Sequence, residues 1–367
     1  MTLIKPLTSL RFFAAGAVAL FHLQGAFGYD VNHISFYPAI TFFFVLSGFI
    51  LAHVHPSFPD KTSVCRYYVS RIARLWPLHL VTAGYFLWFI SVPSKGVIAA
   101  NLLLVQSWSM DVLSAMSMNG VSWSISVEVF FYLLFPALIL TRRFWPLWLL
   151  GSLAVLMYGM LMATNAGELE ETMDGASWLN FIHVGPPARF LEFLAGVLTA
   201  LVFKRLRKPN WPSWAWTVLE VLVVAGVVIA CQADPWLTLS SFYFPPALHV
   251  WFYCSGTFPL MCLVVLCFAY SEGAVSRVLS WRPLVFMGEI SFSLYMVHQL
   301  VLVTWIIQGR APNTWDPGAL ALITAQILGI SVLCYLLVER PAKTALLRGY
   351  ERLAALLSIK REQPSPT

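Results

Sequence analysis

Charged residues are scarce in this chain. Asp, Glu, Lys and Arg make up 11% of its 367 residues, whereas apolar residues make up 59%; a soluble globular domain has about 25% charged residues. So few charged side chains cannot cover a soluble core of this size, and the apolar surface must therefore face lipid. The composition excludes a soluble globular protein and predicts an all-α integral membrane protein.

Metal and redox motifs are also missing. The 6 cysteines have no metal-binding or redox spacing and are interpreted as ordinary small apolar residues. The histidines form no metal motif either, so no metal is expected. A net charge of +6 is compatible with a nucleic-acid partner, but the positions of the basic residues explain it better. We expect contact with membrane lipids and none with nucleic acid.

A cleavable signal peptide is not indicated. Lys5 and the apolar run after it begin like one, but Arg11 and His22 interrupt the run and no convincing small-residue cleavage site follows. We interpret the run as an uncleaved first span.

Ten apolar runs are each near the length of about 20 residues that crosses a bilayer as a helix. They cover residues 8–28, 36–54, 75–92, 121–140, 144–163, 184–203, 213–231, 248–270, 288–308 and 318–338. The 15 Trp and 13 Tyr residues suit interfacial aromatic belts. A further apolar stretch, 96–107, is short, and the topology decides whether it crosses.

The basic residues predict that topology. If the N-terminus is cytoplasmic and 96–107 does not cross, every Lys and Arg lies on the inside except Lys95 and Arg310 outside and Arg189 within a span. A crossing by 96–107 would invert every later loop. The positive-inside rule therefore predicts ten spans with both termini cytoplasmic. We expect one membrane domain over 1–345 and a basic amphipathic cytoplasmic tail over 346–367.

Two ionisable residues lie on one face of the first span. Arg11 and His22 are eleven residues apart, which is three helical turns plus about 20°, and the helical rise separates them by about 16 Å. Ionisable groups inside a membrane are costly and are functional candidates by default. The alternative is a snorkelling arginine and a histidine that packs in the core.

Glu128 in the fourth span lies at about the same depth as His22, roughly 10 Å below the outer face. A carboxylate at that depth can fix the tautomer of an imidazole that acts as a base. Alternatively, Glu128 pairs with Arg189, or Arg189 and Glu192 satisfy each other at i,i+3. The sequence leaves these pairings open.

Two further polar positions lie near the midplane. Ser47 and Gly48 are typical of close helix packing, and His298 is a second candidate base or ligand. On the cytoplasmic side, Arg71 and Arg74 are at i,i+3 and present two guanidinium groups on one face if the segment is helical, which suits a phosphate-bearing ligand. The alternative is a topological role and contact with anionic lipid.

Seven short motifs occur in series along nearly the whole chain. They are Arg11-X10-His22; Phe43-Phe44-X-X-Ser47-Gly48; Arg71-X-X-Arg74 with Pro77; Trp123-Ser124-Ile125-Ser126-Val127-Glu128 with Tyr132; Arg189 with Glu192, Phe193 and Gly196; Ile290-Ser291-Phe292-Ser293-Leu294-Tyr295 with His298; and Glu339-Arg340-Pro341. Together they resemble the acyltransferase-3 family of membrane-bound O-acyltransferases. Each motif alone is weak, and the series is specific.

The resemblance implies ten core helices, an acyl-CoA donor such as acetyl-CoA, and a carbohydrate or lipid-linked glycan as acceptor, in a bacterial inner (cytoplasmic) membrane. The short stretch after the last span resembles the stand-alone branch that has no SGNH hydrolase-like domain. We predict three groups of site residues on this basis. They are His22, Arg11 and Glu128 for catalysis; Arg71, Arg74, Ser47 and Arg66 for the donor; and Trp123, Ser124, Arg189, Tyr295 and His298 for the acceptor.

The predicted reaction is direct transfer in which His22 is the general base. Arg11 holds acyl-CoA or stabilises developing negative charge. An acyl-histidine intermediate is the competing chemistry. A transporter or flippase of a glycolipid or small solute also fits buried charges in a polytopic protein, but the chain has no internal repeat and no paired broken helices. A non-catalytic scaffold would not require the buried arginine and histidine.

Overall fold

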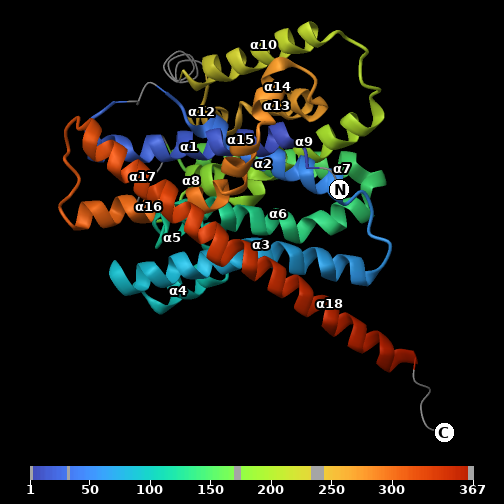
Figure 1. The fold of residues 1–367 in the computed structure, drawn as a ribbon, viewed down its shortest axis with the longest axis horizontal. Coiled ribbons are helices and arrows are strands. Elements are labelled where there is room, and N and C mark those ends of the chain that lie inside the picture. The colour runs from blue at the N-terminus through green and yellow to red at the C-terminus, as the bar shows by residue number, and fades with distance from the viewer. Residues whose placement is uncertain (1–2, 31–33, 169–174, 233–243, 363–367) are drawn as a thin grey trace.

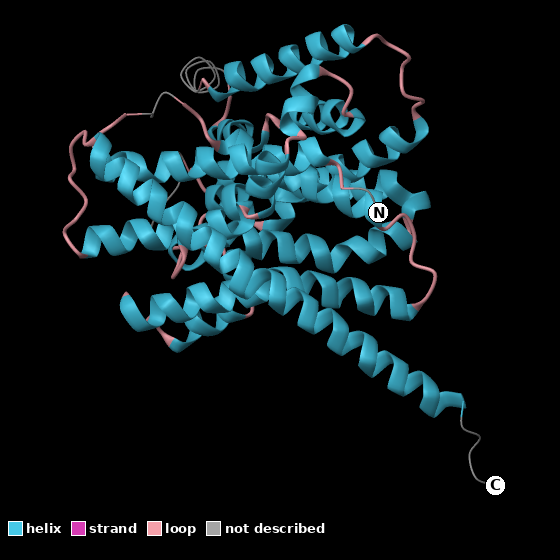
Figure 2. Ribbon diagram, viewed as in Figure 1, coloured by secondary structure: helices cyan, strands magenta, loops and turns pink. Residues whose placement is uncertain are grey.

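The protein is all-helical in its described part. The computed structural model describes residues 3–30, 34–168, 175–232 and 244–362, with side chains up to 356, and these residues contain no named strand (Figures 1 and 2). The long helices α1, α3, α6 and α16 run across Figure 1 in similar directions, as expected for a membrane bundle. This confirms the predicted all-α polytopic class.

The long helices and the broken pairs have the following bounds. They are α1 (Lys5–Phe27), α2 (Tyr37–Val54), α3 (Lys61–Phe89), α6 (Trp123–Leu140), α7 (Trp145–Asn165), α9 (Pro186–Arg205), α10 (Ser213–Cys231), α12 (Pro246–Ser255) with α13 (Phe258–Tyr270), α15 (Arg282–Glu289) with α16 (Ser291–Ile307), α17 (Pro317–Cys334) and α18 (Arg340–Glu362). The short helical pieces are α4 (Lys95–Leu102), η1 (Gln106–Trp108), α5 (Val112–Ala115), η2 (Gly120–Ser122), η3 (Arg142–Phe144), α8 (Trp178–Val184), α14 (Ala274–Leu279) and the π-helical turn η4 (Tyr335–Glu339).

Nine of the ten predicted spans meet a test of length and apolar composition within the described residues. Eight continuous helical stretches pass it, and α15 with α16, bent by 58°, makes a ninth. The remaining span, predicted at 75–92, is the second part of the 29-residue helix α3, whose first part is basic. The stretch 96–107 folds as α4 and η1, both too short to cross. The helix α18 runs without a break through the predicted domain boundary at 345.

The helix α3 begins well before its predicted span because Asp60 caps it. The Asp60 carboxylate accepts a hydrogen bond of 2.7 Å from the Ser63 backbone N–H, and the Ser63 side chain returns a bond to the cap residue. Such a capping box satisfies backbone N–H groups that the first turn leaves without partners. The segment that carries Arg71 and Arg74 is therefore helical, as the i,i+3 interpretation required.

Glycines bring the helices α2 and α9 into direct backbone contact. A Cβ built on Gly48 would lie 2.0 Å from the Phe193 carbonyl oxygen, and a Cβ on Gly196 would lie 2.0 Å from the Val45 carbonyl oxygen. Small residues permit this close approach between membrane helices. The packing role predicted for Gly48 is confirmed, and the crossing fixes the rotation of α2 that carries Ser47.

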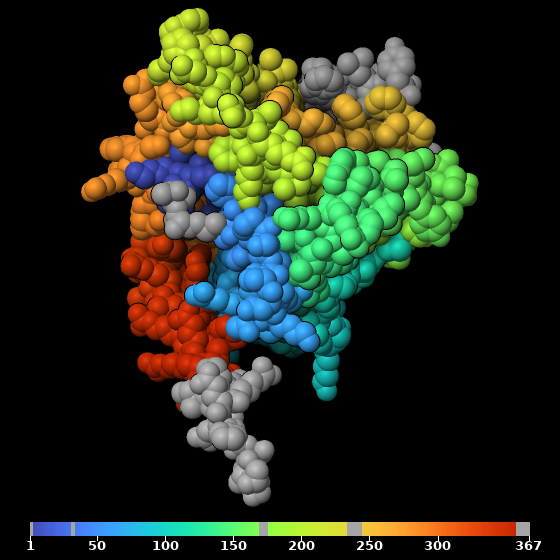
Figure 3. All heavy atoms as spheres, turned by 90° about the vertical axis from the view of Figure 1, so that its right-hand side faces the viewer, coloured from blue at the N-terminus to red at the C-terminus, as the bar shows by residue number. Residues whose placement is uncertain are grey.

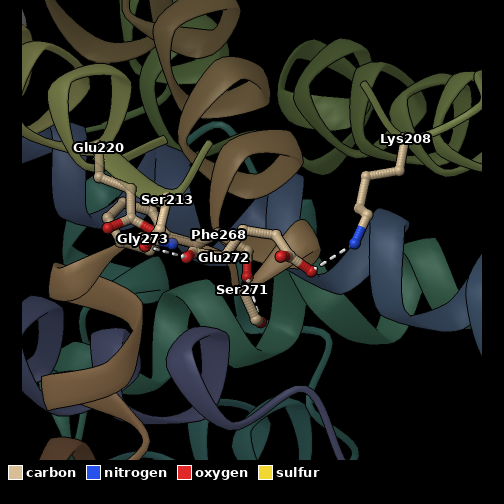
Figure 4. A network of polar contacts seen from close by, with 7 residues as sticks. All are labelled: Lys208, Ser213, Glu220, Phe268, Ser271, Glu272 and Gly273. Carbon is tan, nitrogen blue, oxygen red and sulfur yellow. Dashed lines mark hydrogen bonds and ion pairs between the residues drawn. The ribbon is translucent and has the colours of Figure 1, made fainter. Parts of the chain in front are cut away.

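A buried carboxylate holds the segment against which α1 packs. Glu220 on α10 accepts a hydrogen bond from the backbone N–H of Gly273, the residue before α14 (Figure 4). It also accepts from the backbone N–H groups of Val275 and Ser276 in the first turn of α14. At the end of α14, the Leu279 carbonyl accepts a hydrogen bond from Ser9 Oγ. The N-terminal part of α1, which carries Arg11, is thereby tied to the rest of the bundle.

Replacing Gly48 by alanine is expected to destabilise the protein by about 1–3 kcal/mol, because the new methyl group overlaps the α9 backbone. The measurement is the thermal unfolding midpoint of the detergent-purified protein. Gly84→Ala on α3 is the matched control, because nothing lies within 4 Å of its added Cβ. Equal midpoints for the two variants would contradict the α2–α9 contact.

Candidate active site

Three arginines line one cavity between the first part of α1, the second half of α2 and the middle of α3 and α6. Arg11, Arg71 and Arg74 surround a cavity of about 280 Å³ together with Ser47 and Glu128. Among the described residues that line it, Glu128 is the one acidic residue, so positive charge exceeds negative charge in this lining. Figure 3 shows the blue α2–α3 segment beside the red α18. We refer to this space as the arginine cavity.

Aromatic side chains hold the arginines in place. The Arg71 guanidinium lies 5.7 Å from the ring centres of both Tyr67 and Tyr132, within the range of cation–π attraction. Tyr132 Oη donates a hydrogen bond of 3.0 Å to Glu128 Oε2. The cavity wall is therefore a connected set of charged and aromatic groups.

His55, in the loop between α2 and α3, lies beside this wall. Its ring packs against Phe58 and Tyr67. Burial, and then the nearby Arg71 charge, lower the pKa of His55 to about 4. At neutral pH the imidazole is therefore uncharged, and the positive charge of the arginine cavity comes from its arginines.

A second, smaller cavity continues from the first. Its volume is about 50 Å³, and it shares Arg11, Arg74 and Glu128 with the arginine cavity. Its far wall is formed by Ser124 and Tyr295, whose hydroxyl oxygens are 2.8 Å apart. The Tyr295 ring centre is in turn 5.9 Å from that of His298. Polar groups thus continue from the arginines toward the histidine.

His22 and His298 are joined by a direct hydrogen bond. His22 Nδ1 lies 3.0 Å from His298 Nε2, the ring planes are 15° apart and the ring centres are 5.2 Å apart. The distance between the ring centres is close to the sum of the Nδ1–Nε2 distance and the radii of the two rings. The rings therefore meet edge to edge in one plane, and the two nitrogens point at each other.

The backbone decides the direction of this bond. His298 Nδ1 lies 3.2 Å from the Leu294 carbonyl oxygen, which can only accept a hydrogen bond. With neutral rings, His298 carries its proton on Nδ1, and its Nε2 accepts a hydrogen bond from His22 Nδ1–H. The lone pair of His22 is then on Nε2, assigned from the hydrogen-bond network. Such a nitrogen can take a proton from a substrate hydroxyl.

Residues 5–338 match the sequence profile of the acyltransferase domain family. The chain belongs to this acyltransferase family, as its motifs predicted. The protein is therefore an enzyme that transfers acyl groups.

The chain is similar to three curated bacterial acyltransferases. It is 31% identical to acyltransferase MdmB of Streptomyces mycarofaciens, over 92% of this chain and 91% of that protein. It is 22% identical to the putative peptidoglycan O-acetyltransferase YrhL of Bacillus subtilis (strain 168), over 97% of this chain and 57% of that protein. It is 23% identical to O-acetyltransferase OatA of Staphylococcus aureus (strain MRSA252), over 97% of this chain and 59% of that protein. The chain thus spans less than two thirds of the length of the two O-acetyltransferases. No solved structure matches it.

Glu128 makes neither of the contacts that the sequence left open for it, with His22 or with Arg189. It accepts a hydrogen bond from Tyr132 and lines both cavities, whereas His22 bonds to His298 and Arg189 pairs with Glu192. Glu128 lies beside Arg11, which is about 16 Å along α1 from His22. Packing sets the offset of one helix along its neighbour as well as its rotation, and the sequence of a single helix records neither. The residue that faces His22 is His298.

Arg189 and Glu192 form a buried ion pair, which is one of the pairings the sequence left open. Both are buried, and Arg189 Nε lies 2.9 Å from Glu192 Oε2. Glu192 also accepts a hydrogen bond of 2.9 Å from Thr41 Oγ1. The guanidinium lies 5.3 Å from the ring centre of Phe44, and this ring lines the second cavity. Arg189 therefore supports the cavity wall from behind.

Two other predicted site residues, Arg66 and Trp123, do not line the arginine cavity. Arg66 is on the surface, where its Nη2 lies 2.6 Å from Glu351 Oε1 of α18, with both side chains more than half exposed. Trp123 is buried, with its ring against those of Phe44 and His183. Both assignments stay predictions, and neither residue lines the arginine cavity.

Two charged residues near the arginines were given no role by the sequence reasoning. Glu339, in the π-helical turn η4, accepts a hydrogen bond of 2.9 Å from Ser293 Oγ and is close enough to Arg74 and Arg11 to interact with their charges. Lys343 on α18 is likewise near Arg74 and Arg71. The sequence feature that could have pointed to Glu339 is a carboxylate at the end of an apolar run, in Glu339-Arg340-Pro341. The π-helical turn that carries it agrees with such a role, because π-helical turns are frequent at functional sites.

Replacing Arg189 by methionine is expected to destabilise the acyltransferase by about 3–5 kcal/mol, because it leaves the buried Glu192 charge unpaired. Adding Glu192→Gln to this variant removes that charge and is expected to recover part of the loss. Thermal unfolding and acyl transfer are measured on the two variants in parallel. If Arg189→Met unfolds at the same temperature as the unmodified protein but has lost acyl transfer, Arg189 instead has a direct role at the substrate.

Proposed function

We propose that the protein moves an acyl group, an acetyl group in the first instance, from cytoplasmic acyl-CoA to a hydroxyl of a cell-envelope glycan or glycolipid. The proposed location is a bacterial cytoplasmic membrane. The observation that carries the proposal is the arginine cavity, where three guanidinium groups face one carboxylate in the half of the bundle that the basic residues assign to the cytoplasmic side. The acceptor class rests on the names of the O-acetyltransferase relatives, since the name of MdmB specifies no acceptor.

The excess positive charge supports an anionic donor. Burying a guanidinium in a membrane domain is costly unless an anion compensates it. Glu128 and the nearby Glu339 offset part of the charge of Arg11, Arg71 and Arg74. The phosphates of acyl-CoA would supply the rest, and planar guanidinium groups bind phosphate with two parallel hydrogen bonds. The arginine cavity would hold one part of the donor, and the rest of the donor would extend through the open end of the cavity.

The chemical step is direct acyl transfer to a hydroxyl. His22 Nε2 takes the proton of the acceptor hydroxyl as its oxygen attacks the thioester carbonyl. The carbon–sulfur bond breaks, and the departing CoA sulfur receives the proton from the imidazolium. The products are the ester and CoA thiol, and His22 returns to its starting form.

The other polar residues have roles around this step. His298 holds the His22 tautomer through its accepting Nε2. Arg11 lines both cavities and is positioned to stabilise negative charge on the thioester oxygen. Ser124 and Tyr295 stand between the arginines and the histidines, where the acyl group would pass or the acceptor would be held.

Replacing Arg71 or Arg74 by alanine is expected to weaken acetyl-CoA binding by about 10–100-fold, the loss of a charge-assisted hydrogen bond of about 1.5–3 kcal/mol. Equilibrium binding to the purified protein in nanodiscs is the measurement. Lys61→Ala, which removes an exposed cation from the same helix outside the arginine cavity, is the matched control and should bind normally. Unchanged affinity in both test variants would remove the phosphate assignment.

Replacing His22 by alanine is expected to lower the acylation rate about 10²–10⁴-fold through loss of the general base, without weakening acetyl-CoA binding. His298→Leu removes the acceptor for His22 Nδ1–H and should lower kcat, whereas His298→Gln restores an accepting oxygen and should recover part of the rate. Equal rates for these two His298 variants would refute the orienting role.

The direct route has its own test within the same experiment. Incubation with labelled acetyl-CoA in the absence of acceptor should leave the protein unlabelled. A labelled acyl group on His22 would show the acyl-histidine route instead.

A further inference from the structure

An apolar groove lies between the helices α6, α7 and α9. Its volume is about 530 Å³, within the roughly 300–1,000 Å³ typical of ligand sites. One wall is the helix α7, which lies at the edge of the protein and is seen in green in Figure 3. Only 22% of the most apolar stretch of Arg142–Asn165 is buried, so this helix faces lipid. We refer to the space as the α7 groove.

The α7 groove is separate from the arginine cavity. Phe130 and Leu134 of α6 line the groove, whereas Glu128 and Tyr132 of the same helix line the arginine cavity. Residues two apart on a helix point about 200° apart, so the two spaces lie on opposite sides of α6. None of the described residues that line one space lines the other. A ligand of the groove is therefore distinct from the donor held by the arginines.

The groove has the length of one lipid leaflet. It begins at Thr141 and Phe144, in the turn that the topology assigns to the cytoplasmic side, and reaches Phe130 on α6 and Val155 on α7. Along each helix these two points are eleven residues apart, or about 16 Å by the helical rise. Half of a hydrocarbon core of about 30 Å is about 15 Å. The groove therefore runs from the lipid head groups to the middle of the membrane.

The interior of the groove suits a hydrocarbon chain. Gly151 lines it on α7, and a Cβ built on this glycine would meet nothing within 4 Å. The polar side chains of the lining are paired within the protein: Trp148 Nε1 donates to Thr141 Oγ1 over 2.9 Å, and Ser152 Oγ donates to the Trp148 carbonyl over 2.8 Å. The groove thus offers open space and an apolar surface.

Two exposed arginines lie at the cytoplasmic mouth of the groove. Arg142 and Arg143 stand in the chain between Thr141 and Phe144, which both line the groove. The central carbon of the Arg143 guanidinium is 4.6 Å from the ring centre of Phe144, so its charge lies against the groove wall. Neither arginine forms an ion pair with another residue that the structure describes. The mouth therefore presents uncompensated positive charge at the level of the lipid phosphates.

We propose that the α7 groove binds an anionic phospholipid of the cytoplasmic leaflet. One acyl chain lies along the groove over Gly151, and the phosphate binds the guanidinium groups of Arg142 and Arg143 at the mouth. The positive charge at the mouth selects an anionic head group over a zwitterionic one. This site goes beyond the proposed function, because it holds neither the donor nor the acceptor.

The bound lipid supports the second cavity from the membrane side. Phe190 lines the groove, and its ring centre is 5.9 Å from that of Phe131. The Phe131 ring centre is 5.3 Å from that of Phe44, which lines the second cavity. A continuous set of rings thus joins the two spaces. Because a ligand that binds only the folded state stabilises it, added lipid should raise the thermal unfolding midpoint.

The test is native mass spectrometry of the full chain in detergent, titrated with dioleoyl phosphatidylglycerol or dioleoyl phosphatidylcholine. The two lipids have the same chains and differ in net charge. We expect phosphatidylglycerol to bind about tenfold more tightly. Replacing both Arg142 and Arg143 by glutamine should remove this preference. Gly151→Leu should weaken binding of both lipids about tenfold, because its side chain occupies the groove.

Matched controls remove the same charge or add the same side chain elsewhere. Replacing Arg205 and Arg207 together by glutamine removes two exposed cytoplasmic arginines, and Gly84→Leu fills open space on α3. None of these residues lines the groove. Both variants should bind the two lipids as the unmodified protein does.

Three results would each overturn the proposal. They are equal affinity of the unmodified protein for the two lipids, a preference for phosphatidylglycerol that survives the loss of Arg142 and Arg143, and normal lipid binding by Gly151→Leu. The same spectra also report a second copy of the chain as the alternative occupant. A dimer that is present in the unmodified protein and lost in Gly151→Leu would assign the groove to self-association instead of lipid.

Discussion

Like charges buried together inside a membrane domain are the constraint on which this structure depends. Arg11 comes from α1, and Arg71 and Arg74 come from α3, and all three face the same cavity. Coulomb repulsion between such groups is strong where water is scarce, so each needs a compensating neighbour. Glu128 and Glu339 supply carboxylates, and the Tyr67 and Tyr132 rings supply aromatic faces.

The same constraint explains why the surrounding helices are held rigidly. The Gly48 and Gly196 contacts fix α2 on α9, and the Glu220 hydrogen bonds fix the turn that leads into α14, to which α1 is tied through Ser9. A cavity rich in one sign of charge would open or flood with water if these helices could shift. Rigid support keeps its arginines directed at a ligand, which is the preorganisation that an anion site needs.

Charge and proton chemistry are separated along the first helix. The arginines lie at one end, and the His22–His298 pair lies about three turns further along. A backbone carbonyl, that of Leu294, sets the proton position on His298 and through it the tautomer of His22. Because a neutral acceptor orients the base, the pair adds no net charge to the membrane interior.

The sequence by itself determined the class, the family and the order of the helices, because apolar length and basic asymmetry are properties of the chain read locally. It also determined the i,i+3 relation of Arg71 and Arg74 and the possible pairing of Arg189 with Glu192, since both are set within one helix. Only the tertiary structure decided that His298, and not Glu128, meets His22, and that Arg66 lies on the surface. The physical reason is that the rotation and tilt of each helix depend on side-chain packing against helices distant in sequence, which no spacing along one helix records.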